Sequence, residues 1–316
     1  MSRPAILAVS RLPPFLLEPL QAAYVVHERL HETDPAAFAQ AASGIRALVG
    51  GGESKVPRAL MDQLPALEMI SIVGVGYADV DIPAALERHI PVTHTPGVLN
   101  DEVADLAIGL MLSVARCIPQ ADRYVRAGRW ASEGAMPLSR KVSGARLGIV
   151  GLGRIGQAIA RRAEAFGMSI AYTARSARPG VAYSFYPTTQ ALAAQVDFLI
   201  VITPGGAGTR HLINAEVLQA LGSEGYLINV ARGSVVDEAA LVHALQQGVI
   251  AGAGLDVFEK EPHVPETLRA LDNVVLTPHI ASATRQTRQA MADLAAANLA
   301  AHFAGQPLLS PVPEWC

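Results

Sequence analysis

Cysteine, net charge and long apolar runs are all scarce in this chain. Its two cysteines, Cys117 and Cys316, are too few for a disulfide framework or a four-cysteine zinc site, and we expect no metal centre. A formal net charge of −3, without long runs of Lys and Arg, argues against nucleic-acid partners. No window approaches the roughly 18 uninterrupted apolar residues of a membrane span. Pro13 and Pro14 break the apolar run near the amino end, so we expect no signal peptide and a cytoplasmic location.

Apolar residues, by contrast, are abundant at 51%, and charged residues make up 17% of the 316 positions. This balance and length predict a folded chain of two domains. Short apolar runs alternate with longer Ala- and Leu-rich amphipathic stretches, the pattern of parallel sheets with helical crossovers, so the predicted class is α/β. Five strand candidates begin near residues 5, 25, 47, 70 and 91, and six more begin near residues 146, 169, 197, 225, 251 and 274.

The segment GLGRIG has the residues of a dinucleotide-binding turn. It directly follows the predicted strand RLGIV and opens the predicted helix QAIARRAEAFG. In such a turn the first glycine permits a tight bend, the second lets the backbone approach a pyrophosphate, and the third allows close helix packing. The predicted cofactor-binding residues here are Gly151, Gly153, Arg154, Ile155 and Gly156.

The residues that follow the next strand point to NADPH rather than NADH. An acidic side chain about 20 residues beyond the glycines normally binds the ribose hydroxyls of NAD. This chain has YTARSARPG there and offers no carboxylate. Arg175, Ser176 and Arg178 instead suit a 2′-phosphate, which an acid would repel, although solvated surface arginines are an alternative interpretation.

Three further motifs place a polar residue at the end of a predicted strand, where open α/β sheets bind ligands. They are NVARGSVVDEAAL with Arg232, GLDVFEKEP with Glu261, and LTPHIASAT with His279. Carbonyl reduction by hydride needs a proton donor for the developing alkoxide, and a carboxylate substrate needs a cation. A histidine, a glutamate and an arginine supply these groups.

In these four co-ordered motifs the chain resembles the D-isomer-specific 2-hydroxyacid dehydrogenase family, in its glyoxylate/hydroxypyruvate reductase branch. The resemblance implies two Rossmann-like, doubly wound domains with parallel sheets and an active site in the interdomain cleft. Residues 1–98 plus 283–316 would form the substrate domain, and residues 99–282 the dinucleotide-binding domain. The implied activity is NADPH-dependent reduction of a small 2-oxo acid.

The resemblance also assigns individual roles. Arg232 would bind the substrate carboxylate and carbonyl, His279 would be the general acid, and Glu261 would hydrogen-bond His279, because a neighbouring carboxylate favours a protonated imidazole. Backbone N–H groups of Val75 and Gly76 would contact the substrate carboxylate. The cofactor would also be bound by Thr203, Pro204, Val230, Ala231 and Asp256.

Two other segments bear on partners and substrate choice. Trp130 falls where family dimers reach across their interface, so a homodimer is expected, although a core tryptophan is an equal alternative. The loop VGGGESKVP lacks an arginine in VGGG, which favours a small or neutral side chain such as that of glyoxylate or hydroxypyruvate.

Other activities stay open. Hydroxyphenylpyruvate reductases that use NADPH share this arrangement, and non-catalytic NAD(P)H sensors are built on the same fold. Formate dehydrogenase is disfavoured, because that branch has glutamine where Glu261 stands. Phosphoglycerate dehydrogenase is disfavoured because many such enzymes carry an extra regulatory domain.

Overall fold

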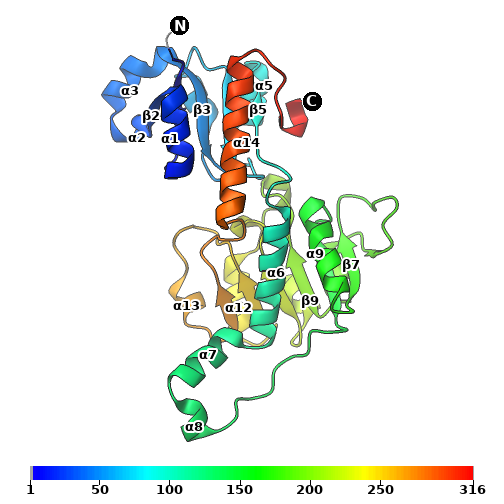
Figure 1. Ribbon diagram of the computed structural model, residues 1–316. Helices are drawn as coiled ribbons and strands as arrows, with labels where there is room; N and C mark the ends of the chain where they lie inside the picture. Colours follow the sequence, from blue (N-terminus) through cyan, green and yellow to red (C-terminus); the bar gives the residue numbers. More distant parts are fainter. Residues whose placement is uncertain (1–2, 316) are drawn as a thin grey trace. The chain divides into compact units, whose positions relative to one another are not determined.

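The computed structural model describes residues 3–315 and divides the chain into two compact units. The first unit comprises the residues up to Leu99 together with those from Thr284 onward, and the second unit is Asn100–Ala283. In Figure 1 the blue amino-terminal segments and the orange carboxyl-terminal helix therefore belong to one unit, although they are far apart in sequence. Each unit has its own sheet, and all strand pairs in both sheets are parallel, which confirms the predicted α/β class.

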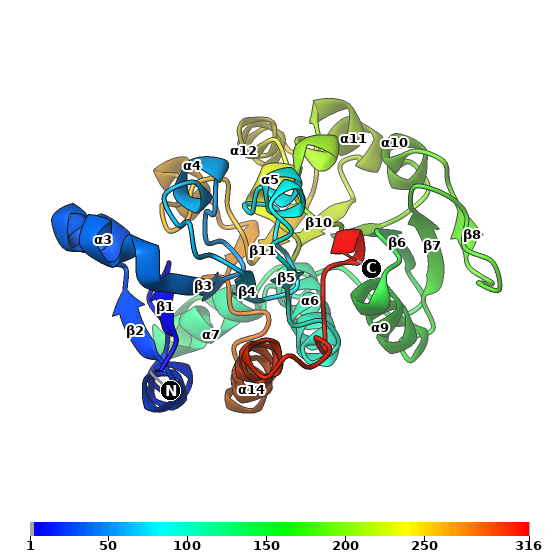
Figure 2. The ribbon, with the colours of Figure 1, turned by 90° about the horizontal axis from the view of Figure 1, so that it is seen from above.

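The first unit is a five-stranded sheet of order β2-β1-β3-β4-β5 with helices on both faces. Alternate strand residues point to opposite faces. Ile6 therefore joins a core with α1 and α14, whereas Leu7 joins a core with α3, α4 and α5 (Figure 2). The elements are β1 (Ala5–Ala8), α1 (Pro14–Ala23), β2 (Val25–Glu28), α2 (Leu30–Thr33), α3 (Pro35–Ala41), η1 (Ala42–Gly44), β3 (Ile45–Gly51), α4 (Arg58–Met61), β4 (Met69–Val73), α5 (Ile82–Glu87), β5 (Val92–Thr93), α14 (Arg285–Phe303) and η4 (Pro313–Trp315).

A buried amide fastens the carboxyl-terminal segment to this unit. The side chain of Asn298, in α14, is fully buried and its Oδ1 accepts from the backbone N–H groups of Leu309 and Ser310 at 3.0 and 3.1 Å. Its Nδ2 donates to the Ser310 hydroxyl at 2.8 Å, and that hydroxyl donates to the His94 carbonyl at 2.6 Å. The Asn298 side chain thus supplies hydrogen-bond partners to the turn after α14, and the Ser310 hydroxyl links this turn to the segment after β5.

The second unit is a seven-stranded sheet of order β12-β11-β10-β9-β6-β7-β8. Figure 2 shows α10, α11 and α12 along one face and α6 with α9 along the other. The elements are α6 (Asn100–Ala115), α7 (Ile118–Arg126), α8 (Arg129–Glu133), β6 (Arg146–Val150), α9 (Arg154–Glu164), β7 (Ser169–Thr173), β8 (Ser184–Phe185), α10 (Thr189–Ala193), β9 (Phe198–Val201), η2 (Ala207–Thr209), α11 (Ala215–Leu221), β10 (Tyr226–Asn229), η3 (Gly233–Val235), α12 (Glu238–Gln246), β11 (Gly252–Leu255), α13 (Glu266–Arg269) and β12 (Val274–Leu276).

The glycines of β11 let α6 lie close to the sheet. A Cβ added to Gly254 would come within 3.0 Å of Leu110 Cβ, and one added to Gly252 within 3.0 Å of Val114 Cγ2. Both partners lie on α6. The alternating glycines in this strand therefore leave the space that the helix fills.

Two details differ from the sequence prediction. The two-residue edge strand β8 was not predicted: its residues are exposed or half-buried, whereas those of β5, which is equally short, are buried. The apolar helix from Asn100 also ends at Ala115 rather than running on through Ile118. Cys117 has a left-handed φ of 51°, and a new helix begins at Ile118 with a proline in its first turn. Among the described residues, no helix is long and apolar enough to cross a membrane.

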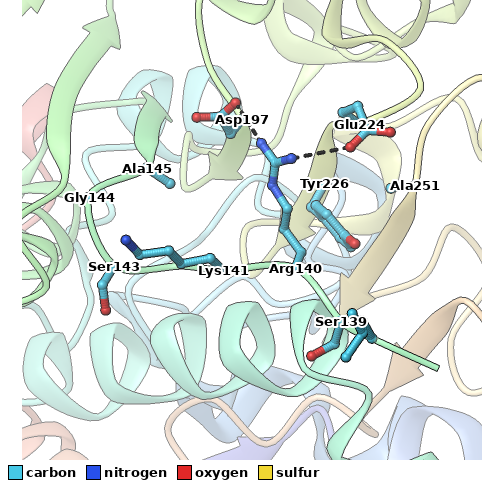
Figure 3. Close-up of a pocket in the computed structure, with 11 residues that line it drawn as sticks. Ser139, Arg140, Lys141, Ser143, Gly144, Ala145, Asp197, Glu224, Tyr226 and Ala251 are labelled. Atoms are coloured by element: carbon cyan, nitrogen blue, oxygen red, sulfur yellow. Dashed lines mark hydrogen bonds and ion pairs between the residues drawn. The ribbon is translucent and has the colours of Figure 1, made fainter. Parts of the chain in front are cut away.

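The amino ends of the central strands carry an ion-pair cluster beside a surface pocket (Figure 3). Arg140 lies between Asp197 and Glu224, with N–O distances of 3.2 and 3.1 Å. Asp197 also binds Arg146 at 2.9 Å. These hydrogen bonds, first those from Arg146, hold the pKa of the Asp197 carboxyl below its usual value. The cluster connects the segment before β6 to the start of β9.

Asp197→Asn should destabilise the protein at pH 7 by about 1–2 kcal/mol, because it removes a charge from hydrogen bonds to two arginines. The folded-state pKa is lowered, so the stabilisation is complete above the ordinary carboxyl pKa and is lost as the pH falls through the lowered one. The stabilities measured by urea unfolding should therefore differ between wild type and variant at pH 7, and the difference should shrink as the pH falls below the ordinary carboxyl pKa.

The matched control is Glu224→Gln. Its side chain is 80% exposed and pairs with the same Arg140, so the change should cost less than about 0.5 kcal/mol. A loss of stability in Asp197→Asn that did not change as the pH was lowered would contradict the electrostatic explanation.

Candidate functional site

The predicted motifs of the second unit meet at one edge of its sheet. Parallel strands all end at the same edge, so the segments after β6, β7, β9, β10, β11 and β12 gather there. The chain builds β7 and β8 on one side of β6, then crosses to build β9 to β12 on the other. The carboxyl ends of β6 and β9 thus flank the topological switch point, where open α/β sheets bind their ligands.

The glycine turn occupies this switch point. Gly151 follows β6 with a left-handed φ of 101°, and an added Cβ would come within 2.8 Å of the Ile202 carbonyl oxygen. A Cβ on Gly156 would collide with the Gly151 carbonyl. No atom lies within 4 Å of a Cβ built on Gly153, so space is open in front of the turn. This arrangement fits a pyrophosphate held by backbone N–H groups at the amino end of α9.

The loop after β7 carries the three residues predicted to bind a 2′-phosphate. Arg175, Ser176 and Arg178 are all exposed. Within residues 3–315, the side chains of these three residues form no ion pair or hydrogen bond, although the Arg178 backbone N–H donates to the Tyr172 hydroxyl. The start of this loop is joined to the glycine turn, because the Gly151 N–H donates to the Thr173 carbonyl at 3.0 Å.

The segments after β9 and β10 pack directly on each other. Thr203 and Pro204 follow β9, and Val230 and Ala231 are buried residues after β10. A Cβ on Gly205 would come within 2.9 Å of Arg232 Cγ, so the arginine stem lies against this glycine.

The backbone around Arg232 is fixed from two sides. The buried Asn229 side chain donates to the Arg232 carbonyl and accepts from the Ala231 N–H, both at 3.1 Å. On the other side, a Cβ on Gly233 would collide with the Phe258 carbonyl. The Arg232 segment therefore touches the backbone that leads to Glu261.

Glu261 and His279 form a hydrogen-bonded pair at the ends of β11 and β12. His279 Nδ1 lies 2.8 Å from Glu261 Oε2, and the other carboxylate oxygen accepts from the Phe258 N–H at 2.9 Å. Their side chains are 29% and 22% exposed. His279 has a left-handed φ of 53°. A residue other than glycine keeps this conformation only where the surrounding structure holds it there.

That constraint comes from Asp256. Its fully buried carboxylate accepts from the Thr277 hydroxyl at 2.6 Å and from the N–H groups of Ile280 and Ala281 at 2.8 and 2.9 Å. Its backbone carbonyl accepts from the His279 N–H at 2.9 Å. The predicted contact of Asp256 with the cofactor stays a prediction, and the observed contacts give it a role in holding the His279 loop.

Sequence reasoning missed Asn229 and this role of Asp256. Asn229 is the last residue of β10, in LIN, and Asp256 directly follows β11, in GLD, so a polar residue at the end of a buried strand was the available signal. Asp256 binds groups 21 to 25 residues further along the chain, and Asn229 binds groups two and three residues away. Neither partner set can be read from the apolar pattern of the strands.

Val75 and Gly76 belong to the first unit, where they follow β4. The Val75 carbonyl lies 3.0 Å from His94 Nδ1. A Cβ on Gly74 would come within 3.0 Å of Gly52 Cα, so this turn packs closely on the glycine-rich loop after β3. Their assignment to a substrate carboxylate stays a prediction.

Trp130 is 65% exposed and is therefore not a core residue. It lies on α8, which with α7 projects from the rest of its unit in Figure 1. Ile118 and Val125, on α7, are 50% and 55% exposed. The two helices thus present an apolar surface, which we call the α7–α8 surface, that no other described residue covers.

Comparison with known proteins extends the resemblance to whole chains. Residues 108–281 match the D-isomer specific 2-hydroxyacid dehydrogenase NAD-binding domain. A glyoxylate/hydroxypyruvate reductase A of Arabidopsis thaliana is 50% identical over 270 residues, 85% of this chain and 86% of its own. A hydroxyphenylpyruvate reductase of Plectranthus scutellarioides is 52% identical over 271 residues, 86% of each chain.

A crystal structure gives the same result in three dimensions. It is that of the NADPH-dependent glyoxylate/hydroxypyruvate reductase of Sinorhizobium meliloti, in complex with NADP and malonate. It superposes with a TM-score of 0.93 at 50% identity, over 99% of this chain and 98% of that one. With its glycine turn, its Glu261–His279 pair and these matches, the chain belongs to the D-isomer specific 2-hydroxyacid dehydrogenase family.

Proposed function

We propose that this protein reduces glyoxylate and hydroxypyruvate to their 2-hydroxy acids with NADPH. The observation that carries the proposal is the His279–Glu261 hydrogen bond of 2.8 Å, beside the Arg232 loop at the edge that holds the glycine turn. The names of the relatives in Arabidopsis and Sinorhizobium support the substrate. The absence of arginine from VGGG, at the end of β3, favours the same small 2-oxo acids.

In the proposed mechanism, bound NADPH supplies the hydride for the substrate C2. Arg232 holds the substrate carboxylate and polarises the carbonyl, which keeps the reacting carbon in place. His279 donates a proton to the forming alkoxide. Because Nδ1 faces Glu261, this donation is assigned to Nε2. Glu261 orients the ring and favours its charged form.

The same proposal covers cofactor choice. Arg175, Ser176 and Arg178 stand where NAD-binding chains carry an acid, and their exposed side chains are engaged with no other described residue. Two cations there attract a 2′-phosphate through charge-assisted hydrogen bonds. The bound NADP of the Sinorhizobium enzyme, a 50% identical chain, supports this preference.

We also propose a homodimer that forms through the α7–α8 surface. Exposed apolar groups gathered on a projecting helix pair favour burial against a second protein surface. A two-fold interface lets the same patch serve both copies, so no other partner is needed.

The first prediction concerns substrate and cofactor. Oxidation of NADPH, followed by its absorbance, should be faster than that of NADH with both glyoxylate and hydroxypyruvate. Arg175→Ala should lower kcat/KM for NADPH about 10- to 100-fold, with little change for NADH, because only NADPH has the phosphate that the arginine binds. Faster turnover of 4-hydroxyphenylpyruvate would favour the activity named for the Plectranthus relative. If no 2-oxo acid were turned over, the result would favour a non-catalytic nucleotide sensor instead.

The second prediction separates binding from proton transfer. Arg232→Ala should raise KM for glyoxylate and lower kcat together, with a combined loss of about 10³-fold or more, because it removes a contact to both substrate and transition state. Glu261→Gln keeps a polar partner for the imidazole but removes the negative charge. It should lower kcat about 10- to 100-fold and displace the pH profile of reduction toward lower pH, with KM little changed.

Steady-state kinetics across pH 5 to about pH 9 measures both variants. Lys141→Ala, at the opposite edge of the sheet, is the control and should match wild type. Unchanged kcat in either site variant would remove that residue from the mechanism.

The third prediction concerns assembly. Light scattering should give a dimer for the wild type, and the double variant Val125→Glu/Trp130→Glu should be a monomer, because charge on the interface opposes burial. Leu309→Glu is the control, since Leu309 is 57% exposed in the first unit, and it should stay dimeric. A wild-type monomer, or a double variant that still dimerises, would exclude this interface.

A further inference from the structure

A buried tyrosine holds the loop that carries the predicted phosphate-binding arginines. Tyr172 is the penultimate residue of β7, and it is only 1% exposed. Its hydroxyl accepts a hydrogen bond of 2.8 Å from the Arg178 backbone N–H. Its ring lies 5.4 Å from the Phe185 ring in β8, centroid to centroid. The ring is thus fixed by packing, and only its oxygen reaches the loop.

The other backbone group of Arg178 is also engaged. The Val181 N–H donates to the Arg178 carbonyl at 3.4 Å, which closes a four-residue turn through Pro179 and Gly180. Gly180 has a φ of 75°, as the third position of a type II turn requires, and proline suits the second position. Arg178 is therefore held at its N–H by Tyr172 and at its carbonyl by the turn, although its side chain is exposed.

The loop is tied at its other end to the phosphate-binding turn. Thr173, next to the tyrosine, accepts from the Gly151 N–H at 3.0 Å. The distance from the glycine turn to the arginines is thus set by a short, hydrogen-bonded stretch of backbone. A binding group that is fixed beforehand loses less conformational entropy when its ligand arrives.

We propose that Tyr172 is a positioning residue for cofactor selectivity: its hydroxyl fixes the Arg178 backbone and so pre-orients the loop of Arg175 and Arg178 toward the 2′-phosphate that distinguishes NADPH from NADH. The inference rests on the proposed NADPH preference. The hydroxyl touches no reacting group, so its effect is confined to the part of the cofactor that carries the extra phosphate.

Binding measurements without turnover test this role. Calorimetric titration with 2′-phospho-ADP-ribose and with ADP-ribose compares two probes that differ only in the phosphate. Tyr172→Phe keeps the ring and removes the hydroxyl. It should weaken the phosphorylated probe about three- to tenfold, the scale of one hydrogen bond, and change ADP-ribose by less than about twofold. The matched control is Tyr183→Phe, which removes a hydroxyl that donates to the exposed Glu164 at 2.8 Å, and it should leave both affinities unchanged.

A second variant reaches the same loop by another route. An alanine Cβ at Gly180 would meet no atom within 4 Å, so Gly180→Ala strains only the turn. Gly180→Ala should weaken binding of 2′-phospho-ADP-ribose but not of ADP-ribose, as Tyr172→Phe does. Gly167→Ala, at an equally open position with a φ of 65° before β7, controls for strain alone and should bind both probes as wild type does.

The outcomes distinguish the NADPH preference from the positioning role of Tyr172. If the wild type binds both probes equally, the NADPH preference itself is wrong, and the role of Tyr172 falls with it. If the wild type prefers the phosphorylated probe and Tyr172→Phe keeps that preference, only the positioning role is wrong. Equal weakening of both probes would show that Tyr172 supports the nucleotide site as a whole, and would also overturn the inference.

Discussion

The close approach of backbone segments at the carboxyl edge of the seven-stranded sheet is the constraint on which the site depends. Four glycines permit it: Gly151 and Gly156 in the phosphate turn, Gly205 beneath the Arg232 stem, and Gly233 against the Phe258 carbonyl. A Cβ at Gly233 would collide with the backbone of the neighbouring segment, so the Arg232 and Glu261 loops would have to separate. The spacing of the reactive side chains is therefore set by backbone contact rather than by the side chains themselves.

Buried polar groups then fix what the glycines bring together. Asp256 binds three donors of the His279 loop, and Asn229 binds the Ala231 N–H and the Arg232 carbonyl. A buried carboxylate is stable only when such donors surround it, which makes the loop geometry and the charge mutually dependent. In this way a short loop holds His279 at a φ that an isolated chain would avoid.

The sequence predicted most of this architecture where the signal was local. Each of the eleven strands foreseen from apolar runs is present. Most are parallel strands buried inside a sheet, which are largely apolar, whereas the edge strand β2, VVHE, is not buried. The strand β8 was not foreseen, since its two residues are only exposed or half-buried at the sheet edge. The break between Ala115 and Ile118 was not foreseen, since it depends on one proline. The pairing of Glu261 with His279 was foreseen only through family resemblance. The contacts of Asn229 and Tyr172 reach only two to six residues along the chain, to Ala231, Arg232 and Arg178. They depend on how the backbone turns after each strand, and apolar periodicity does not encode that turn.

The strand order explains why cofactor choice and proton transfer can change independently. The loop of Arg175 and Arg178 follows β7, on one side of the switch point, whereas Arg232, Glu261 and His279 follow strands on the other side. The glycine turn after β6 touches both sides, through Thr173 on β7 and the Ile202 carbonyl after β9. A substitution that leaves this turn in place is therefore expected to act mainly on its own side. Residues that hydrogen-bond to the loop after β7, such as Tyr172, are thus placed to alter which nucleotide binds while the His279–Glu261 pair keeps its geometry.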